Sequence, residues 1–212
     1  IISLTALAML YAAGVFLKQL SIVTAGLFAF IGVFIYLNPN RIARLTSFWV
    51  DDFWASNDAK VHQTQQALIG IARGDWFGTG IGAGIQKYSL LPERHTDMIF
   101  AVIGEELGIL GMMFVLLSFL FILLKGFKIA KVALQKGRYY SSYVVFGICT
   151  WFAMQITVNI GMNLGLLPPK GFTLPLLSYG GTSMIFAIIS LAIILRVDME
   201  NRTKYSKQRH YV

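Results

Sequence analysis

The sequence has few charged residues and almost no cysteine. Only 13% of its 212 residues are charged, whereas about a quarter is usual for a soluble domain. Cys149 is the only cysteine, which excludes a disulfide scaffold, and the 14% aromatic content excludes intrinsic disorder. The 20 glycines have no period of three, which excludes a collagen-like chain. The 56% of hydrophobic residues exceeds what one soluble core could bury, so the composition predicts a membrane protein.

Basic residues outnumber acidic residues by 18 to 10, which gives a formal net charge of +8. Such an excess can indicate a polyanionic partner. Among the basic segments, however, only Tyr205 and Tyr211 could stack on bases, so a nucleic-acid partner is disfavoured. Anionic lipid headgroups explain the positive charge more simply. We therefore expect the basic segments to lie at a membrane surface, with no nucleic acid as partner.

Five apolar runs are candidates for membrane spans, because about 20 helical residues cross roughly 30 Å of hydrocarbon. They lie at about residues 1–17, 22–37, 98–124, 143–167 and 174–195. The first run has neither an initial methionine nor a charged flank, so we interpret it as a truncated span and not as a signal peptide. The expected fold class is all-α: a polytopic transmembrane helix bundle forming a single membrane domain over residues 1–212. A large extracytoplasmic loop is expected at residues 38–96.

The basic residues of the short connections predict the orientation, because Lys and Arg are rarely translocated across the membrane. The connection between the third and fourth runs carries five basic residues and no acid: Lys125, Lys128, Lys131, Lys136 and Arg138. The segment after the last run is also basic, and Lys18 falls on the same side if the spans alternate. The C-terminus is therefore predicted to be cytoplasmic, and residues 38–96 and 158–173 are predicted to be extracytoplasmic.

The stretch 91–97, LPERHTD, leads from the long loop into the third run. Two interpretations of its aspartate, Asp97, are open. A helix that begins near Thr96 would hold Asp97 in its first turn, where free N–H groups favour a capping carboxylate. Alternatively, a carboxylate at the outer membrane surface, beside Arg94 and His95, can accept a proton from a polar headgroup whose lipid tail stays in the bilayer.

Glu105 and Glu106 lie inside the otherwise apolar third run. Charges at such positions are costly and normally face a bundle interior or a wet cavity. At about 100° per residue, Glu105 lies about 80° round a continuous helix from Asp97, and Glu106 lies on the opposite side. We expect that only Glu105 could share a cavity with Asp97, while Glu106 pairs with another helix. A structural role, with the carboxylate satisfied by hydrogen bonds, stays open for both glutamates.

Glycine-rich segments are interpreted as packing features. Residues 78–84 formally contain a G-x-G-x-x-A motif, but no strand of a βαβ unit precedes it, so a close-packing loop is the favoured interpretation. Residues 104–108 and 161–165 have the small-xxx-small spacing of packed membrane helices. The three histidines form no i, i+4 pair, so the sequence predicts no metal site.

Residues 167–181 contain three prolines and three glycines, which exclude a continuous helix. Irregular backbone at membrane depth must line a cavity or be buried in protein, because lipid cannot satisfy its peptide groups. Lys170 is the only cation of this segment. Its ammonium group could hold a phosphate, or it could extend to the membrane surface as lysines commonly do.

Two of these stretches carry a resemblance to a known family. Residues 91–108, LPERHTDMIFAVIGEELG, and residues 165–183, GLLPPKGFTLPLLSYGGTS, resemble the SEDS family of bacterial cell-wall polymerases, FtsW, RodA and SpoVE. The similarity covers essentially all 212 residues, and Lys170-Gly171 is similar to the FtsW division branch. Family members have more spans than the five found here, so the resemblance implies that the chain is the C-terminal half of such a protein.

The resemblance implies a peptidoglycan glycosyltransferase that polymerises lipid II into glycan strands at the outer face of the cytoplasmic membrane during cell division. Asp97 matches the essential aspartate of the family and would act as general base on the acceptor hydroxyl. Arg94 and Lys170 are the candidate cations for the leaving pyrophosphate. The full set of candidate substrate-binding residues is Glu93, Arg94, His95, Glu105, Lys170, Ser178 and Tyr179.

The partners implied by the resemblance are lipid II, undecaprenyl pyrophosphate, a class B penicillin-binding protein acting as transpeptidase, and other division proteins. The implied location is the bacterial cytoplasmic membrane at the division septum. The resemblance leaves room for a divalent cation, Mg²⁺ or Mn²⁺, although no cluster of ligand residues points to one. Two alternatives stay open: a translocase, or flippase, of lipid-linked precursors that uses Glu105 and Glu106, and a non-catalytic division scaffold. The chain would lack part of the substrate cavity, so it could be inactive when isolated.

Overall fold

The computed structural model describes residues 1–37, 59–86 and 96–209, and within these residues the protein is helical. The helices are α1 (Ile2–Ala12), α2 (Leu17–Tyr36), α4 (Ala59–Gly74), α6 (Ile99–Gln135), α7 (Tyr139–Asn163) and α8 (Gly181–Arg209). The described part of the chain contains no strand. The predicted all-α fold class is confirmed.

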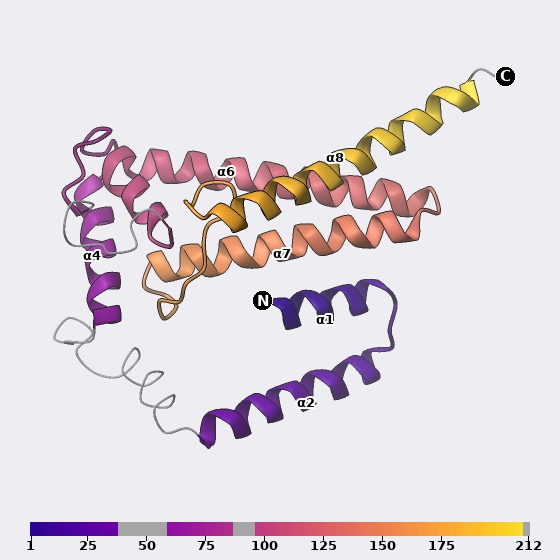
Figure 1. Cartoon of the computed structure of the whole chain (residues 1–212), viewed down its shortest axis with the longest axis horizontal. Coiled ribbons are helices and arrows are strands. Elements are labelled where there is room, and N and C mark those ends of the chain that lie inside the picture. Colours follow the sequence, from indigo (N-terminus) through magenta and orange to yellow (C-terminus); the bar gives the residue numbers. More distant parts are fainter. Residues whose placement is uncertain (38–58, 87–95, 210–212) are drawn as a thin grey trace.

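The three longest helices form the body of the molecule. Helices α6, α7 and α8 lie side by side, and α4 packs across one end of α6 (Figure 1). Helix α1 contacts α7, and α2 contacts α1 on the side away from the other helices. The turn between α1 and α2, next to Lys18, lies at the same end of the molecule as the turn between α6 and α7.

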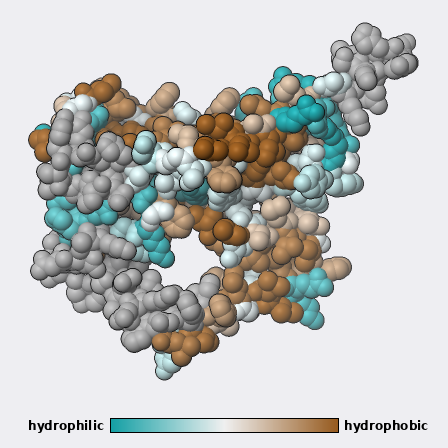
Figure 2. All heavy atoms as spheres, in the orientation of Figure 1, coloured by the Kyte–Doolittle hydropathy of each residue, from teal (hydrophilic) through white to brown (hydrophobic). Residues whose placement is uncertain are grey.

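Helices α6, α7 and the part of α8 up to Thr203 are long and apolar enough to cross a membrane. Much of their apolar surface faces outward: Phe114 is 73% exposed and Phe121 is 62% exposed. Figure 2 shows hydrophobic side chains over the middle of the long helices and hydrophilic side chains towards the C-terminal end of α8. An apolar exterior of this extent requires lipid rather than water as its surroundings. The predicted membrane protein is confirmed.

The helices do not end where the apolar runs end. Helix α6 continues to Gln135, beyond the apolar run that ends at residue 124, because the aliphatic stems of Lys125, Lys128 and Lys131 let a helix extend into the headgroup region. Helix α8 begins at Gly181, and residues 174–180 precede it as a loop. Pro175 has no backbone N–H to donate within a helix, which favours the loop.

Two apolar clusters hold the long helices together. The cluster nearer the α7–α8 loop comprises Phe100, Phe119, Phe152, Ile156, Leu174 and Ala187. The cluster nearer the α6–α7 turn comprises Ala130, Ala133, Val145, Cys149, Ile194 and Val197. In the second cluster a Cβ atom at Gly126 would lie 2.3 Å from the Cys149 sulfur, so glycine is required for α6 and α7 to approach this closely.

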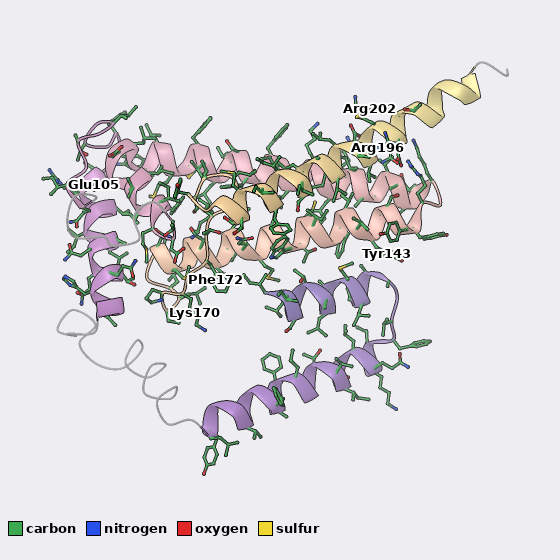
Figure 3. All side chains as sticks on the ribbon, in the orientation of Figure 1. Glu105, Tyr143, Lys170, Phe172, Arg196 and Arg202 are labelled. Atoms are coloured by element: carbon green, nitrogen blue, oxygen red, sulfur yellow. The ribbon has the colours of Figure 1, made fainter. Side chains whose placement is uncertain are left out.

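Polar contacts join the α6–α7 turn to the C-terminal part of α8. Arg138 forms an ion pair with Glu200 and donates to Asn201 Oδ1 at 3.1 Å. Asn201, which is buried, donates to the Ile129 carbonyl at 3.3 Å, and its own carbonyl accepts from Lys136. Figure 3 shows Arg196 and Arg202 at this end and Lys170 and Phe172 at the opposite end. The basic residues of the α6–α7 turn and of the C-terminal part of α8 therefore lie together at one end of the bundle, opposite to Lys170.

Candidate functional site

A cavity of about 480 Å³ lies at the end of the bundle that carries Lys170. Its walls come from α4, the turn before α6, the loop between α7 and α8, and the first turn of α8. The lining residues are Gln63, Thr96, Asp97, Met98, Pro169, Lys170, Gly171, Thr173, Tyr179, Gly180, Thr182 and Ser183. The structure therefore brings Asp97, Lys170 and Tyr179, three of the predicted site residues, to one cavity.

Asp97 lies in the turn before α6 and not in its first helical turn. Helix α6 begins at Ile99 with Met98 as N-cap, no side-chain cap hydrogen bond, and no acidic residue in its first turn. The N–H group of Ala101 in the first turn donates both to the Met98 carbonyl at 3.1 Å and to Asn163 Oδ1 of α7 at 3.0 Å. The expectation that Asp97 lies in the first helical turn as a capping acid is therefore wrong, because α6 begins two residues after it.

The Asp97 carboxylate faces the loop between α7 and α8. A Cβ atom built on Gly171 would lie 3.5 Å from Asp97 Oδ2, with no other atom within 4 Å. Lys170, next to Gly171, has an exposed side chain, and Tyr179 is 79% exposed. A carboxylate, an ammonium group and a phenol thus border the same space, which suits an anionic ligand that also presents a hydroxyl to the carboxylate.

Two buried asparagines of α7 hold the backbone on both sides of this space. Asn159 Nδ2 donates to the carbonyl of Asp97 at 2.9 Å and to the carbonyl of Phe172. Asn163 Nδ2 donates to the Asp97 carbonyl at 3.0 Å. Both side chains are fully buried, where a hydrogen bond is stronger than in water and an unmet one is costly.

The loop between α7 and α8 has further supports. Gln155 Nε2 donates to the Thr173 carbonyl at 2.9 Å. The Ser178 hydroxyl donates to the Thr96 carbonyl and accepts from the Leu174 N–H at 2.6 Å. Ser178 is only 2% exposed and is not among the residues that line the cavity. Its hydroxyl therefore braces the loop, in contrast to the predicted contact with substrate.

Glu105 does not line this cavity. Its carboxylate is fully buried and accepts from the Ile85 N–H at 2.8 Å and from the Gln86 N–H at 3.3 Å, and Arg73 Nη1 lies 3.4 Å away. Figure 3 shows Glu105 beside α4. The angular estimate that linked it to Asp97 assumed one continuous helix, but α6 begins only at Ile99. The prediction that Glu105 shares the cavity is thus corrected: its carboxylate ties the segment after α4 to α6.

The segments 78–84 and 104–108, two of the three glycine-rich segments, pack backbone against backbone, in agreement with their predicted packing role. A Cβ atom at Gly74 would lie 1.9 Å from the Gly104 carbonyl oxygen, and one at Gly78 would lie 2.1 Å from the Glu106 carbonyl oxygen. Gly108 has φ +67° inside α6, and a Cβ there would lie 2.5 Å from the Gly78 nitrogen. These contacts fix α4 against α6, which in turn places Gln63 of α4 at the cavity wall.

Several predicted features lie outside the described residues. Glu93, Arg94 and His95 belong to the segment 87–95, and residues 38–58 of the long predicted loop also lie outside the described ranges. Within the described ranges no group of three His, Cys, Asp or Glu side chains could hold a metal ion. Asp97 is the one carboxylate among the described lining residues. These residues alone do not fit a divalent cation, whose sites need several oxygen ligands.

Sequence reasoning missed two kinds of residue at this site. Gln63, Thr182 and Ser183 line the cavity but were not among the candidate site residues, although Thr182 and Ser183 lie in the stretch 165–183 that resembles the family. Asn159 and Asn163 did carry a signal, because two amides four residues apart within an apolar span are costly unless they meet polar partners. The helical spacing could therefore have identified this pair, though not its partners.

Comparisons with known proteins identify the family to which the chain is similar. The family model for cell cycle proteins FtsW, RodA and SpoVE matches residues 1–203. A probable peptidoglycan glycosyltransferase FtsW from Legionella pneumophila is 45% identical over 207 residues, which are 95% of this chain and 51% of that protein. Its counterpart from Francisella salina is 41% identical over 202 residues, which are 95% of this chain and 50% of that protein.

A solved structure also matches, and it concerns the structural coordination of polymerization and crosslinking by a peptidoglycan synthase complex. The TM-score is 0.69 at 26% sequence identity, and the match covers 92% of this chain and 52% of that chain. This chain spans about half the length of the curated relatives that it matches. Because the family model matches nearly the whole chain, the chain belongs to the FtsW, RodA and SpoVE family of cell cycle proteins.

Proposed function

We propose that this chain is the C-terminal half of a peptidoglycan glycosyltransferase that polymerises lipid II during cell division. The observation that carries the proposal is that Asp97 and Lys170 line one cavity, at the end of the membrane-crossing helices opposite to Arg196 and Arg202. The names of the relatives from Legionella pneumophila and Francisella salina support the same reaction. The chain would form one membrane domain, with part of the substrate cavity supplied by the other half.

The proposed reaction uses Asp97 as general base. Its carboxylate takes the proton of the acceptor sugar 4-hydroxyl as that oxygen attacks the anomeric carbon of the lipid-linked donor. The bond between the anomeric carbon and the phosphate oxygen breaks, and undecaprenyl pyrophosphate leaves with the electron pair. Lys170 stabilises the charge that develops on the pyrophosphate, and Arg94, outside the described residues, is a second candidate. Tyr179 can donate a hydrogen bond to the same polar group.

The proposal extends to location and partners. The protein would lie in the bacterial cytoplasmic membrane at the septum, with the basic end of the bundle and the C-terminus in the cytoplasm. A class B penicillin-binding protein would supply the transpeptidase, because the similar solved structure belongs to a complex that coordinates polymerization and crosslinking. Other division proteins are proposed partners through the family membership. Participation of Mg²⁺ or Mn²⁺ stays a prediction, and no step of the reaction above uses a metal.

The structure removes Glu105 as support for the translocase alternative. That alternative relied on Glu105 and Glu106 facing a polar cavity, but the Glu105 carboxylate is occupied by backbone N–H groups of the segment after α4. The scaffold alternative requires no cavity chemistry. It therefore gives no reason for a carboxylate and an ammonium group to line the same space.

Replacing Asp97 tests the proposed function. The full-length parent protein and its Asp97→Asn variant are assayed for glycan chains made from purified lipid II, with and without a class B penicillin-binding protein. We expect Asp97→Asn to lower the rate by at least about 100-fold, because a positioned general base contributes roughly 10²- to 10⁴-fold. The matched control is Asp198→Asn, the same chemical change at a residue that pairs with Arg202 at 2.7 Å at the other end of the bundle. Undiminished polymerisation by Asp97→Asn would refute the assignment.

A further inference from the structure

We propose that Asn159 is a positioning residue that sets the spacing between Asp97 and the loop carrying Lys170. The inference rests on the function proposed above and adds to it a residue that acts through others. Asn159 lies on α7, which is packed between α6, α8 and α1. From this helix its side-chain amide contacts the turn before α6 on one side and the α7–α8 loop on the other.

The hydrogen bonds of Asn159 use both N–H groups of its amide. The Asp97 carbonyl accepts at 2.9 Å, and the Phe172 carbonyl accepts on the other side. An asparagine amide has two N–H donors, so its donor capacity is matched by these two backbone carbonyls. The side chain is fully buried, and its Oδ1 accepts from Asn163 Nδ2 at 3.3 Å. A rigid planar group thus joins the two backbone segments.

This amide contacts the backbone close to both charged groups of the cavity. One partner carbonyl belongs to Asp97 itself, and the other belongs to Phe172, two residues after Lys170. Losing the amide would free both segments from α7 at once. A general base and a cation need their separation held closely, because a shift of about 1 Å can cost roughly 100-fold in rate. Asn159 therefore affects the reaction through geometry, without touching the substrate.

Two neighbouring residues on α7 serve as matched controls, because the side-chain amide of each donates to only one of the two segments within the described residues. Asn163 donates to the Asp97 carbonyl at 3.0 Å, in the turn before α6, while Gln155 donates to the Thr173 carbonyl at 2.9 Å, in the loop. Ser178 also joins the two segments, but through Thr96 and Leu174 and from within the loop itself. Replacing Asn159 should thus differ in kind from replacing Asn163 or Gln155.

The first measurement reports the spacing without relying on activity. In the full-length protein with other cysteines removed, Asp97→Cys and Gly171→Cys form a reporter pair, since a Cβ at Gly171 lies 3.5 Å from Asp97 Oδ2. We expect Asn159→Leu to lower the rate of disulfide formation in this pair about 30-fold, the equilibrium equivalent of two net hydrogen bonds of about 1 kcal/mol each. Asn163→Leu and Gln155→Leu, which each lose one hydrogen bond to these segments, should lower it only about fivefold. An unchanged rate in Asn159→Leu, or an equal fall in all three variants, would overturn the proposal.

The second measurement is polymerisation of lipid II, with Asp97 and Gly171 intact. We expect Asn159→Leu to lower the kcat of polymerisation by about 10- to 100-fold with KM nearly unchanged. If Asn159→Leu slowed disulfide formation in the reporter pair but left kcat unchanged, that result would also overturn the proposal. If Asn159→Leu does not fold, Asn159→Asp tests the same point, because it keeps the shape and removes both N–H donors when ionised. If the proposed function is wrong, Asp97→Asn keeps its activity, while the reporter pair still decides whether Asn159 sets the spacing.

Discussion

Asp97 and Glu105 show how two acids of the same stretch acquire different roles. Asp97 lies in a turn, and its carboxylate faces a cavity that also contains Lys170. Glu105 lies inside α6, and its carboxylate accepts hydrogen bonds from the Ile85 and Gln86 N–H groups. These N–H groups stabilise the Glu105 carboxylate, and the side chain is fully buried, so a ligand cannot reach it. The surroundings of each carboxylate therefore decide which of the two can take part in chemistry.

Replacing Glu105 should affect stability more than chemistry. Glu105→Ala leaves the Ile85 N–H and the buried Gln86 N–H without their acceptor and removes the partner of Arg73. We expect it to lower the free energy of unfolding by about 3 kcal/mol, and Glu105→Gln by about half of that because one acceptor oxygen remains. Thermal unfolding of the full-length protein in detergent would rank the two variants. If the Glu105→Ala protein were stable but failed to polymerise lipid II, the prediction that Glu105 binds substrate would be supported instead.

At the scale of the element, α6 is not one uninterrupted helix. Gly108 has φ +67° within it, and this break brings the segment after α4 into backbone contact with α6. The N–H groups of Ile109 and Leu110 donate to the carbonyls of Asp75 and Trp76 at 2.9 and 3.3 Å. In a continuous helix these N–H groups would donate to carbonyls of the same helix. Here they connect α6 to the segment after α4. Such an exchange explains how a short amphipathic helix, α4, attaches to a membrane span.

Gly108→Ala should therefore separate α4 from α6. The side chain would adopt a left-handed backbone conformation, which costs about 1–2 kcal/mol, and would overlap the Gly78 nitrogen at 2.5 Å. We expect a loss of at least about 3 kcal/mol in unfolding free energy. The control is Gly137→Ala, which has φ +70° but no atom within 4 Å and should cost only the backbone term. Equal losses in the two variants would show that the contact with Gly78 contributes nothing.

For the whole molecule, the placement of charge predicts the orientation in the membrane. The α6–α7 turn and the C-terminal part of α8 carry clusters of basic residues, while the cavity with Lys170 lies at the other end of the same helices. Basic ends are retained in the cytoplasm. This orientation predicts that the cavity opens towards the extracytoplasmic side, where we propose that the reaction takes place.

Labelling from outside the cell tests this orientation. In the full-length protein with Cys149→Ser and other cysteines removed, Leu166→Cys should react with a membrane-impermeant maleimide in intact spheroplasts, because position 166 is 62% exposed near the cavity. Tyr140→Cys, at a position 83% exposed beside the α6–α7 turn, should react only after permeabilisation. The reverse pattern would place the cavity in the cytoplasm and exclude the proposed reaction at the outer face.

The sequence by itself determined the membrane location, the all-α class, the family and the identity of the candidate base. Hydropathy and charge act residue by residue, through transfer between water and lipid, so they can be read without knowing which segments meet. The tertiary structure decided which polar groups meet. Asp97, Asn159 and Lys170 converge because α7 returns beside α6, whereas Glu105 is held apart from them by contacts with the segment after α4. Those outcomes depended on where one helix begins and where one glycine interrupts it, and hydropathy is insensitive to both.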